Sequence, residues 1–280
     1  FCPVKTITQP TSMKRQASAW CKAAQRVVLV PTMGALHEGH RSLIQLARRK
    51  ARVDGIVVVS IYVNPLQFND SRDLKSYPRS LAADKQLCRE ELVDAVFAPN
   101  SLYEKDASVV LAENDLTTCL EGKHRPGHFA GVMTVVAKLF NLVCPDFSVF
   151  GEKDFQQAAV IKRMVRDLNF PVSILLGPTK RESDGLAISS RNLLLTGSQR
   201  RQGAVLFKAI DLSRQSLGSR SVDLRRKLRR LIEREPDVRV DYVEFVDTLN
   251  IKPVKIVRKG NRVLLAARVG SVRLIDNGLL

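Results

Sequence analysis

Residues 27–40 read Val-Val-Leu-Val-Pro-Thr-Met-Gly-Ala-Leu-His-Glu-Gly-His, and the architecture of the chain can be worked out from this stretch. The apolar run over residues 27–30 is typical of a strand buried on both faces in a parallel sheet. Apolar residues then recur at helical spacing, which predicts a helix over residues 40–52. His37 and His40 therefore lie where a strand ends and a helix begins. Ligands bind at such junctions in α/β sheets, and helix starts favour anions, so we expect a nucleotide site here.

Strand-like and helix-like segments continue to alternate as far as residue 176. Strands are predicted at residues 27–30, 56–63, 95–98, 148–150 and 172–176, and helices at residues 40–52, 81–91, 132–143 and 155–168. This order is typical of an α/β domain with a doubly wound parallel sheet.

The pattern changes after about residue 193. Helices are predicted at residues 198–217 and 222–235, and short alternating strands at residues 240–246, 262–267 and 272–275. These elements indicate a smaller α+β domain with an antiparallel sheet. Because Gly177 and Pro178 interrupt the chain before them, the predicted domains are residues 1–178 and 179–280.

Composition narrows the class of protein. The chain has 280 residues, of which 45% are hydrophobic, so it can bury a large core. The longest apolar stretch, residues 56–63, is too short to cross a bilayer, and we expect no membrane partner. No secretory signal pattern is seen at the N-terminus. The five cysteines show neither close pairing nor metal-ligand spacing, which favours a reduced, cytoplasmic protein.

The net charge of +17 allows two interpretations: a basic, soluble surface, or an anionic partner such as nucleic acid or a phosphate-bearing substrate. The densest basic run is residues 225–230, and leucines recur through it at helical spacing. We interpret it as the solvated side of an amphipathic helix, because no aromatic residues interleave with the arginines for base stacking. Nucleic acid is therefore not the expected partner.

The two histidines allow three interpretations. They could be zinc ligands, but His-x-x-His supplies only two ligands and no Cys or carboxylate pattern completes the set. One of them could cap the helix. The favoured interpretation is that both imidazoles donate hydrogen bonds to a polyphosphate, because they lie on a glycine-bearing turn between a strand and a helix.

Three further segments carry polar side chains: residues 64–68 and 151–157 follow predicted strands, and residues 184–192 lie on a loop near the predicted domain boundary. Each has an ordinary alternative as a turn or a helix cap. Together they favour a ligand site in which Gln67 pairs with a small hydroxy acid and Lys153 neutralises phosphate. In the third segment Ser189, Ser190 and Arg191 form a candidate phosphate clamp. The P-loop, the dinucleotide fingerprint and the serine-hydrolase elbow are all absent from the sequence.

Taken in order, these segments resemble the pantothenate synthetase (pantoate–β-alanine ligase) family. The matching stretches are residues 31–40, 60–68, 77–79, 120–145, 150–157, 184–192 and 273–277. The histidine element alone resembles the wider HIGH-type nucleotidyltransferase superfamily. The sequences Gly-Glu-Lys-Asp-Phe-Gln-Gln at 151–157 and Ile-Ser-Ser-Arg-Asn at 188–192 narrow the resemblance to this family.

The resemblance implies a Rossmann-like N-terminal domain that binds ATP and pantoate, a C-terminal lid domain and a homodimer. It also implies a two-step ligation with Mg²⁺ and ATP. Pantoate attacks the α-phosphate of ATP to form pantoyl adenylate and pyrophosphate, and β-alanine then displaces AMP. Adenylation of a different small acid is the alternative activity.

The resemblance also implies roles for individual residues. His37, His40 and Lys153 would be catalytic. ATP would be bound by Met33, Gly34, His37, Gly39, His40, Gly151, Glu152, Lys153, Asp154, Lys180, Ile188, Ser189, Ser190 and Arg191. Pantoate and β-alanine would be bound by Gln67 and Gln157, with Asn64, Tyr77 and Arg125, and Asp84 would bind Mg²⁺. Lys180 departs from the apolar residue usual in the family, and we interpret His124 and His128 as local turn or surface residues.

Overall fold

The computed structural model describes residues 4–69 and 71–280, which form two compact units. The first comprises the chain up to Glu152 together with Gln157–Pro178, and the second comprises Lys153–Gln156 and Thr179–Leu280. The sequence placed the whole of the chain before residue 179 in one domain. The structure instead groups the short Lys153–Gln156 segment with the C-terminal residues.

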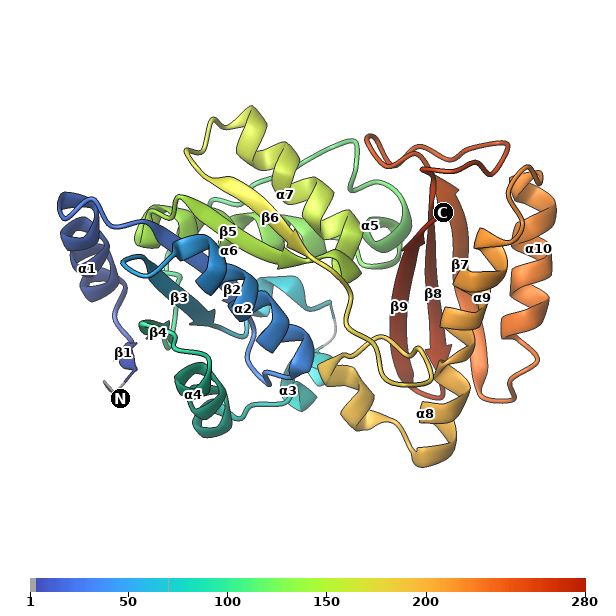
Figure 1. The fold of residues 1–280 in the computed structure, drawn as a ribbon, viewed down its shortest axis with the longest axis horizontal. Coiled ribbons are helices and arrows are strands. Elements are labelled where there is room, and N and C mark those ends of the chain that lie inside the picture. The colour runs from blue at the N-terminus through green and yellow to red at the C-terminus, as the bar shows by residue number, and fades with distance from the viewer. Residues whose placement is uncertain (1–3, 70) are drawn as a thin grey trace. The chain divides into compact units, whose positions relative to one another are not determined.

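A six-stranded sheet is the centre of the first unit, and all of its strands are parallel (Figure 1). Its order is β1 (Lys5–Ile7), β4 (Ala95–Phe97), β3 (Ile56–Ile61), β2 (Val27–Thr32), β5 (Phe147–Gly151) and β6 (Ser173–Gly177). The predicted doubly wound α/β fold is confirmed. Because β2 pairs with β3 on one side and with β5 on the other, the strand order reverses at the β2–β5 pair. Ligands bind at such a reversal, beyond the carboxyl ends of the strands.

Helices cover both faces of this sheet, and α2 crosses in front of β2 in the view of Figure 1. Val28 and Val30 of β2 share a buried cluster with Ile44 and Ala47 of α2. Leu29 is also fully buried and, because side chains alternate along a strand, it faces the opposite side. The unit contains α1 (Pro10–Lys22), α2 (Glu38–Ala51), η1 (Pro65–Gln67), α3 (Ser71–Ser76), α4 (Leu81–Glu90), α5 (Leu120–His124), α6 (His128–Val143), η2 (Glu152–Asp154) and α7 (Phe155–Asp167), the last two continuing across the division between the units.

The second unit is a three-stranded antiparallel sheet with helices along it (Figure 1). Its elements are η3 (Ser190–Leu194), α8 (Gly197–Gly203), α9 (Val205–Arg214), α10 (Ser221–Ile232), β7 (Val238–Val246), β8 (Arg262–Val269) and β9 (Val272–Leu279). Ile210 of α9 and Leu228 of α10 pack with Phe245 and Leu265 of the strands in one buried cluster. The predicted α+β character of this part is confirmed.

The largest differences from the predicted elements are at three places. The single helix expected at residues 198–217 is two helices that meet at Ala204. The residue before it, Gly203, packs closely against Leu186 and Leu274. Helix α6 begins four residues earlier than expected, at His128. Strand β9 continues beyond Ile275 to Leu279, because the polar residues that seemed to end it find hydrogen-bond partners.

The basic run at residues 225–230 lies on α10, as the amphipathic interpretation predicted. Leu224, Leu228 and Ile232 are buried, and Arg225 donates to Glu244 at 2.7 Å. Arg229 donates to Glu233 and to the carbonyl of Val240, both at 3.0 Å. Several of these arginines therefore serve local ion pairs. Across residues 4–69 and 71–280, no helix has both the length and the apolar character needed to cross a membrane.

Candidate active site

The turn after β2 is held in place by a buried carboxylate. Gly34 and Ala35 both adopt positive φ angles, of 82° and 51°. Asp84 of α4 accepts hydrogen bonds from the backbone N–H groups of Ala35 at 3.0 Å and Leu36 at 2.8 Å. A Cβ atom on Gly34 would lie 2.9 Å from Asp84 Oδ2. Glycine therefore suits this position for two reasons: it tolerates the positive φ angle, and it leaves room for the carboxylate.

Asp84, which the resemblance implies as a Mg²⁺ ligand, supports the turn in this structure. Its exposed fraction is 2%, and its Oδ1 also accepts from Ser80 Oγ at 3.1 Å. Both oxygens thus accept from protein donors, and through these bonds the residue positions the turn. Among the residues that the structure describes, no three His, Cys, Asp or Glu side chains form a group that could hold a metal ion.

His37 and His40 stack at the start of α2, with ring centroids 4.1 Å apart. His37 is the N-cap of the helix, and its Nδ1 accepts from the backbone N–H of Gly39 at 3.1 Å. Nδ1 of His40 accepts from the backbone N–H of His37 at 3.3 Å. A nitrogen that accepts a hydrogen bond carries no proton, so these contacts assign the proton of each neutral ring to Nε2. The cap interpretation thus holds for His37, and it makes both imidazoles Nε2–H donors.

Gln67 is buried beside the end of β3, where Asn64 orients it. The Asn64 side-chain amide donates from Nδ2 to the carbonyl of Gly131 and to Gln67 Oε1, both at 3.0 Å. Because a backbone carbonyl can only accept, this contact fixes which atom of Asn64 is nitrogen. Tyr103 donates its hydroxyl proton to Asn64 Oδ1 at 2.9 Å, and burial raises the pKa of the Tyr103 phenol. Gln67 therefore holds its oxygen toward Asn64 and has Nε2 as its donor.

The backbone of Gln67 is held by His128, the first residue of α6, and by Arg125, which follows the end of α5. His128 Nδ1 lies 2.8 Å from the Gln67 carbonyl, and Arg125 donates to the same oxygen at 3.2 Å. His128 Nε2 lies 3.1 Å from Arg125. The expectation that His128 is a local turn or surface residue is wrong, because its side chain is buried against this peptide. Arg125, which the resemblance placed near the substrate, contacts the peptide of Gln67 in this structure.

Tyr77 and Gly151 are further candidate residues of the first unit. Tyr77 is buried and packs edge-on against Phe68 at 5.6 Å between centroids, directly beside the Gln67 segment. Gly151 ends β5, which pairs with β2, and a Cβ atom there would lie 3.8 Å from Leu43 of α2. Met33 and Gln157 are half-buried in the turn after β2 and in α7.

The second unit carries the remaining candidates in two segments. Glu152–Asp154 forms the short helix η2, of which Lys153 and Asp154 belong to this unit, and Lys153 Nζ lies 3.9 Å from Asp154 Oδ1. Ile188 donates its backbone N–H to the carbonyl of Lys180 at 3.0 Å, which brings two of the predicted ATP-binding residues together.

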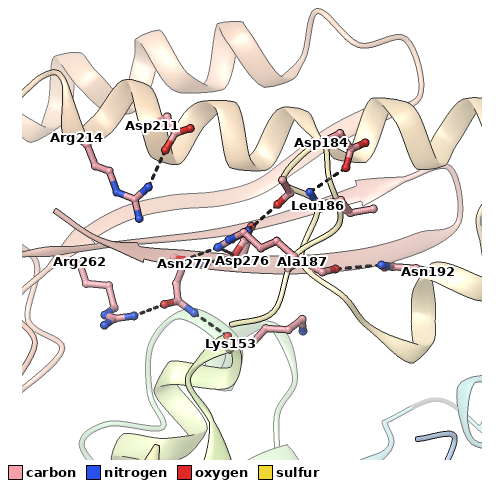
Figure 2. A network of polar contacts seen from close by, with 12 residues as sticks. Lys153, Asp184, Leu186, Ala187, Asn192, Asp211, Arg214, Arg262, Asp276 and Asn277 are labelled. Atoms are coloured by element: carbon pink, nitrogen blue, oxygen red, sulfur yellow. Dashed lines mark hydrogen bonds and ion pairs between the residues drawn. The ribbon is translucent and has the colours of Figure 1, made fainter. Parts of the chain in front are cut away.

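Residues 187–192 form a tight turn that holds the candidate phosphate clamp. Ser189 Oγ accepts from the N–H of Arg191 at 3.3 Å. Asn192 donates to the Ala187 carbonyl at 3.0 Å (Figure 2). Ser190 is buried, whereas Arg191 is half-buried. Just before this turn Asp184 pairs with Arg200, and that guanidinium lowers the pKa of the Asp184 carboxyl.

Comparison with known proteins identifies the family. A family model described as pantoate–β-alanine ligase matches residues 5–279. The chain belongs to the pantoate–β-alanine ligase family. It is 48% identical to the pantothenate synthetase of Aquifex aeolicus over 259 residues, with 90% of each chain covered.

Two solved structures of the family have the same fold. The pantothenate synthetase of Thermus thermophilus is 39% identical, with a TM-score of 0.89 and 99% of each chain covered. The pantoate–β-alanine ligase of Francisella tularensis, solved in complex with β-γ ATP and β-alanine, is 34% identical, with a TM-score of 0.81 and coverage of 99% of this chain and 97% of that one. The Rossmann-like architecture implied by the resemblance is thus confirmed.

In this member of the pantoate–β-alanine ligase family several candidate site residues are held by others that the sequence reasoning missed. His128, Tyr103 and Arg262 were assigned no role, and Asn277 was noted only as part of a matching stretch. Their signal in the sequence is weak because their partners are backbone carbonyls or residues far along the chain. The available sequence signals were His128, which precedes a predicted helix, and the polar pair Asp276 and Asn277, which follows a predicted strand.

Proposed function

We propose that the residues described above carry out the ATP-dependent condensation of (R)-pantoate with β-alanine to pantothenate, with release of pyrophosphate and AMP. Membership of the family makes the chain a ligase that binds ATP. The observation that carries the residue assignment is the pair of Nε2–H imidazoles on the turn between β2 and α2. Two neutral donors beside a helix N-terminus suit a polyphosphate.

In the first step the carboxylate of pantoate attacks the α-phosphate of ATP, and the bond to pyrophosphate breaks. The substrate supplies the nucleophile, so the protein needs only to position the reactants and to stabilise the charge that develops on phosphate oxygens. We assign this stabilisation to His37, His40 and Lys153. Ser189, Ser190 and Arg191 are proposed to hold the nucleotide and the departing pyrophosphate. The other proposed ATP-binding residues are Met33, Gly34, Gly39, Gly151, Glu152, Asp154, Lys180 and Ile188.

Pantoate is proposed to bind at Gln67 and Gln157. Since Asn64 occupies the oxygen of the Gln67 amide, Gln67 would donate from Nε2 to a hydroxyl or carboxylate oxygen of pantoate. Asn64, Arg125 and Tyr77 would act by fixing the position of Gln67. In the second step the amine of β-alanine attacks the acyl carbon of the mixed anhydride, and AMP leaves with the electron pair of the broken C–O bond.

Magnesium is proposed to enter as part of the substrate, MgATP. The described residues offer no cluster of three or more His, Cys, Asp or Glu metal ligands, and both oxygens of Asp84 accept hydrogen bonds from the turn that it supports. We further propose a cytoplasmic homodimer whose ligands are small molecules. No role in nucleic-acid binding is proposed, because arginines of the densest basic run form ion pairs with Glu244 of β7 and with Glu233 at the end of α10.

Pyrophosphate release tests this function. The protein is incubated with MgATP and pantoate without β-alanine, and we expect pyrophosphate up to about one equivalent per site, followed by AMP and pantothenate when β-alanine is added. Other small hydroxy acids serve as controls. Pyrophosphate release that does not depend on pantoate, or that is greater with another acid, would contradict the proposal.

A further inference from the structure

Two adjacent polar residues, Asp276 and Asn277, are buried inside strand β9. Their exposed fractions are 3% and 4%, and both keep their antiparallel register with β8, opposite Leu265 and Leu264. Successive side chains of a strand point to opposite faces of the sheet, so the pair presents one polar group to each face. Burying two polar side chains costs stability unless both are fully hydrogen-bonded, and their partners indicate what they do.

Asn277 links strand β9 to the backbone of Lys153. Its Nδ2 donates to the Lys153 carbonyl at 2.7 Å, while its Oδ1 accepts from Arg262 of β8 (Figure 2). A guanidinium can only donate and a carbonyl can only accept, so these two partners fix the orientation of the amide. Position 277 therefore requires one short side chain with both an acceptor, for Arg262, and a donor, for the Lys153 carbonyl.

The same segment is held a second time by Arg262. The guanidinium carbon of Arg262 lies 4.2 Å from the ring centroid of Phe155, two residues after Lys153. Arg262 is itself 5% exposed, and its contacts reach both Asn277 and Phe155. Contacts from β8 and β9 thus explain why residues 153–156 group with the C-terminal unit.

Asp276 anchors the loop that leads into residues 187–192, the second segment proposed to bind ATP in this unit. It forms a two-point ion pair with Arg181, at 2.6 and 2.9 Å, and Arg181 also donates to the carbonyl of Gly185 at 2.9 Å. This loop leads directly into residues 187–192. Arg181 also donates to the backbone carbonyl of Asn277 at 3.3 Å. The Arg181 loop and the Lys153 segment are therefore both attached to β9 at residues 276 and 277.

We propose that Asn277 is a positioning residue for Lys153, which it holds by its backbone while the side chain extends away from the contact (Figure 2). Arg262 orients the Asn277 amide, and Asp276 fixes the neighbouring loop to the same strand end. The inference rests on the proposed role of Lys153 at the phosphates of ATP. Its consequence is that the position of the catalytic ammonium depends on a strand near the C-terminus.

The substitution Asn277→Asp tests the inference with little change in shape. The carboxylate can still accept from Arg262, but its other oxygen would face the Lys153 carbonyl, and two acceptors repel. We expect the rate of pantoate-dependent pyrophosphate release to fall about 10- to 100-fold, the scale for a misplaced catalytic group. The KM for pantoate should stay within about twofold, because its proposed ligands lie in the other unit.

Asn250→Asp is the matched control. Asn250 is exposed in the same unit, and the hydrogen bond seen for its side chain uses only Oδ1, which accepts from Lys252 at 2.9 Å. The substitution keeps that bond and adds the same charge. We expect the wild-type rate from this variant.

A double-mutant cycle with Lys153→Ala separates positioning from a general structural effect. Lys153→Ala keeps the backbone carbonyl but removes the ammonium group. If Asn277 acts through Lys153, then Asn277→Asp should cost almost nothing further in the Lys153→Ala protein. Should Asn277→Asp fail to fold, Asn277→Ala enters the same cycle in its place.

The outcomes are distinct. Wild-type protein without pantoate-dependent pyrophosphate release would overturn the proposed function. An active wild type with an unaffected Asn277→Asp variant would overturn the present inference alone. The inference would also fail if the losses from Lys153→Ala and Asn277→Asp multiply in the double variant, since the asparagine would then act independently of the lysine.

Discussion

At the scale of single residues, the hydrogen bonds that His37 and His40 make to the backbone determine which ring nitrogen can donate to a phosphate. Each Nδ1 accepts a backbone N–H at the start of α2, so the proton of each neutral ring is on Nε2. Gly39 is needed for this arrangement, because a Cβ atom there would lie 2.9 Å from the His37 ring. Capping the helix and donating to phosphate are therefore compatible roles for the same side chain.

Replacing His40 should impair the first chemical step. We expect His40→Ala to lower the rate of pantoate-dependent pyrophosphate release by about 100-fold or more, the cost of losing one preorganised donor. Single-turnover measurements of pyrophosphate would show it. His124→Ala, on the exposed end of α5, is the control. A rate near that of the wild type would refute the assignment of His40.

Replacing Asp84 should affect stability more than metal dependence. Asp84→Asn turns one acceptor into a donor that faces a backbone N–H group, so we expect the free energy of unfolding to fall by about 2–3 kcal/mol. Urea denaturation measures this change. The Mg²⁺ concentration that half-saturates activity should not change. A large increase in that concentration without loss of stability would restore Asp84 as a metal ligand.

Cys88 introduces a pH dependence of stability whose sign can be worked out. Burial raises the pKa of this thiol from 9.0 to about 12, and the nearby Asp84 carboxylate adds to the shift. The unfolded chain therefore loses the proton first. The stabilisation is fully present below pH 9 and declines as the pH rises from there toward 12.

Urea denaturation at pH 8 and pH 10 would detect this decline, whose slope for one thiol reaches about 1.4 kcal/mol per pH unit. Comparison with Cys88→Ala isolates the thiol, because the other titrating groups are shared. The variant should lose less stability than the wild type between the two pH values. Equal losses would mean that Cys88 ionises normally in the folded protein.

At the scale of elements, the position of Gln67 depends on how closely α6 packs against η1. A Cβ atom on Gly131 of α6 would lie 2.3 Å from the carbonyl oxygen of Leu66 and 2.9 Å from the N atom of Gln67. These are backbone atoms, which cannot rotate away. The hydrogen bond from Asn64 to the Gly131 carbonyl is possible only because the two elements lie this close.

Adding a methyl group at this contact should therefore move the pantoate residue. We expect Gly131→Ala to raise the KM for pantoate about tenfold and to destabilise the fold by about 1–3 kcal/mol, a typical cost of overpacking. Steady-state kinetics and urea denaturation measure the two effects. Gly197→Ala is the control, because a Cβ atom there meets only Arg201 at 3.9 Å. An unchanged KM would mean that η1 does not set the position of Gln67.

At the scale of the whole molecule, the net charge of +17 is larger than the site itself requires. Much of it lies on exposed arginines and lysines outside the motifs, including those of α10. A positive surface attracts ATP and pantoate, which are both anions, and raises their rate of encounter. The surface charge would thus act on the substrates before any binding residue contacts them.

This field should be visible in the salt dependence of the reaction. We expect kcat/KM for MgATP to fall several-fold between about 0.02 M and about 0.5 M NaCl, because salt screens long-range attraction. The kcat at saturating substrate should change less, since it does not depend on encounter. A kcat/KM that is independent of salt would show that the charge does not steer the substrate.

Much of the fold was predictable from the sequence because the apolar spacing within short segments matches the residues that the structure buries. The apolar run of β2, the helical spacing of α2 and the basic face of α10 are each recognisable within about 15 residues of chain, and the structure contains all three. Helix α1 has a similar signal in the spacing of Met13, Ala17 and Trp20, but it was not predicted. The residues proposed for ATP and pantoate lie in local motifs, and their roles are what the resemblance of those motifs to the family implies.

How those residues are held is visible only in the folded chain. Asp84 holds the turn from another helix, Asn64 orients Gln67 through the carbonyl of Gly131, and Asn277 reaches Lys153 from the last strand. Local sequence determines which segments become strands and helices, because propensity and apolar spacing act over short distances. A hydrogen bond between distant residues, often to a backbone carbonyl that every residue has, leaves no local pattern, so its partner is known only once the chain has folded.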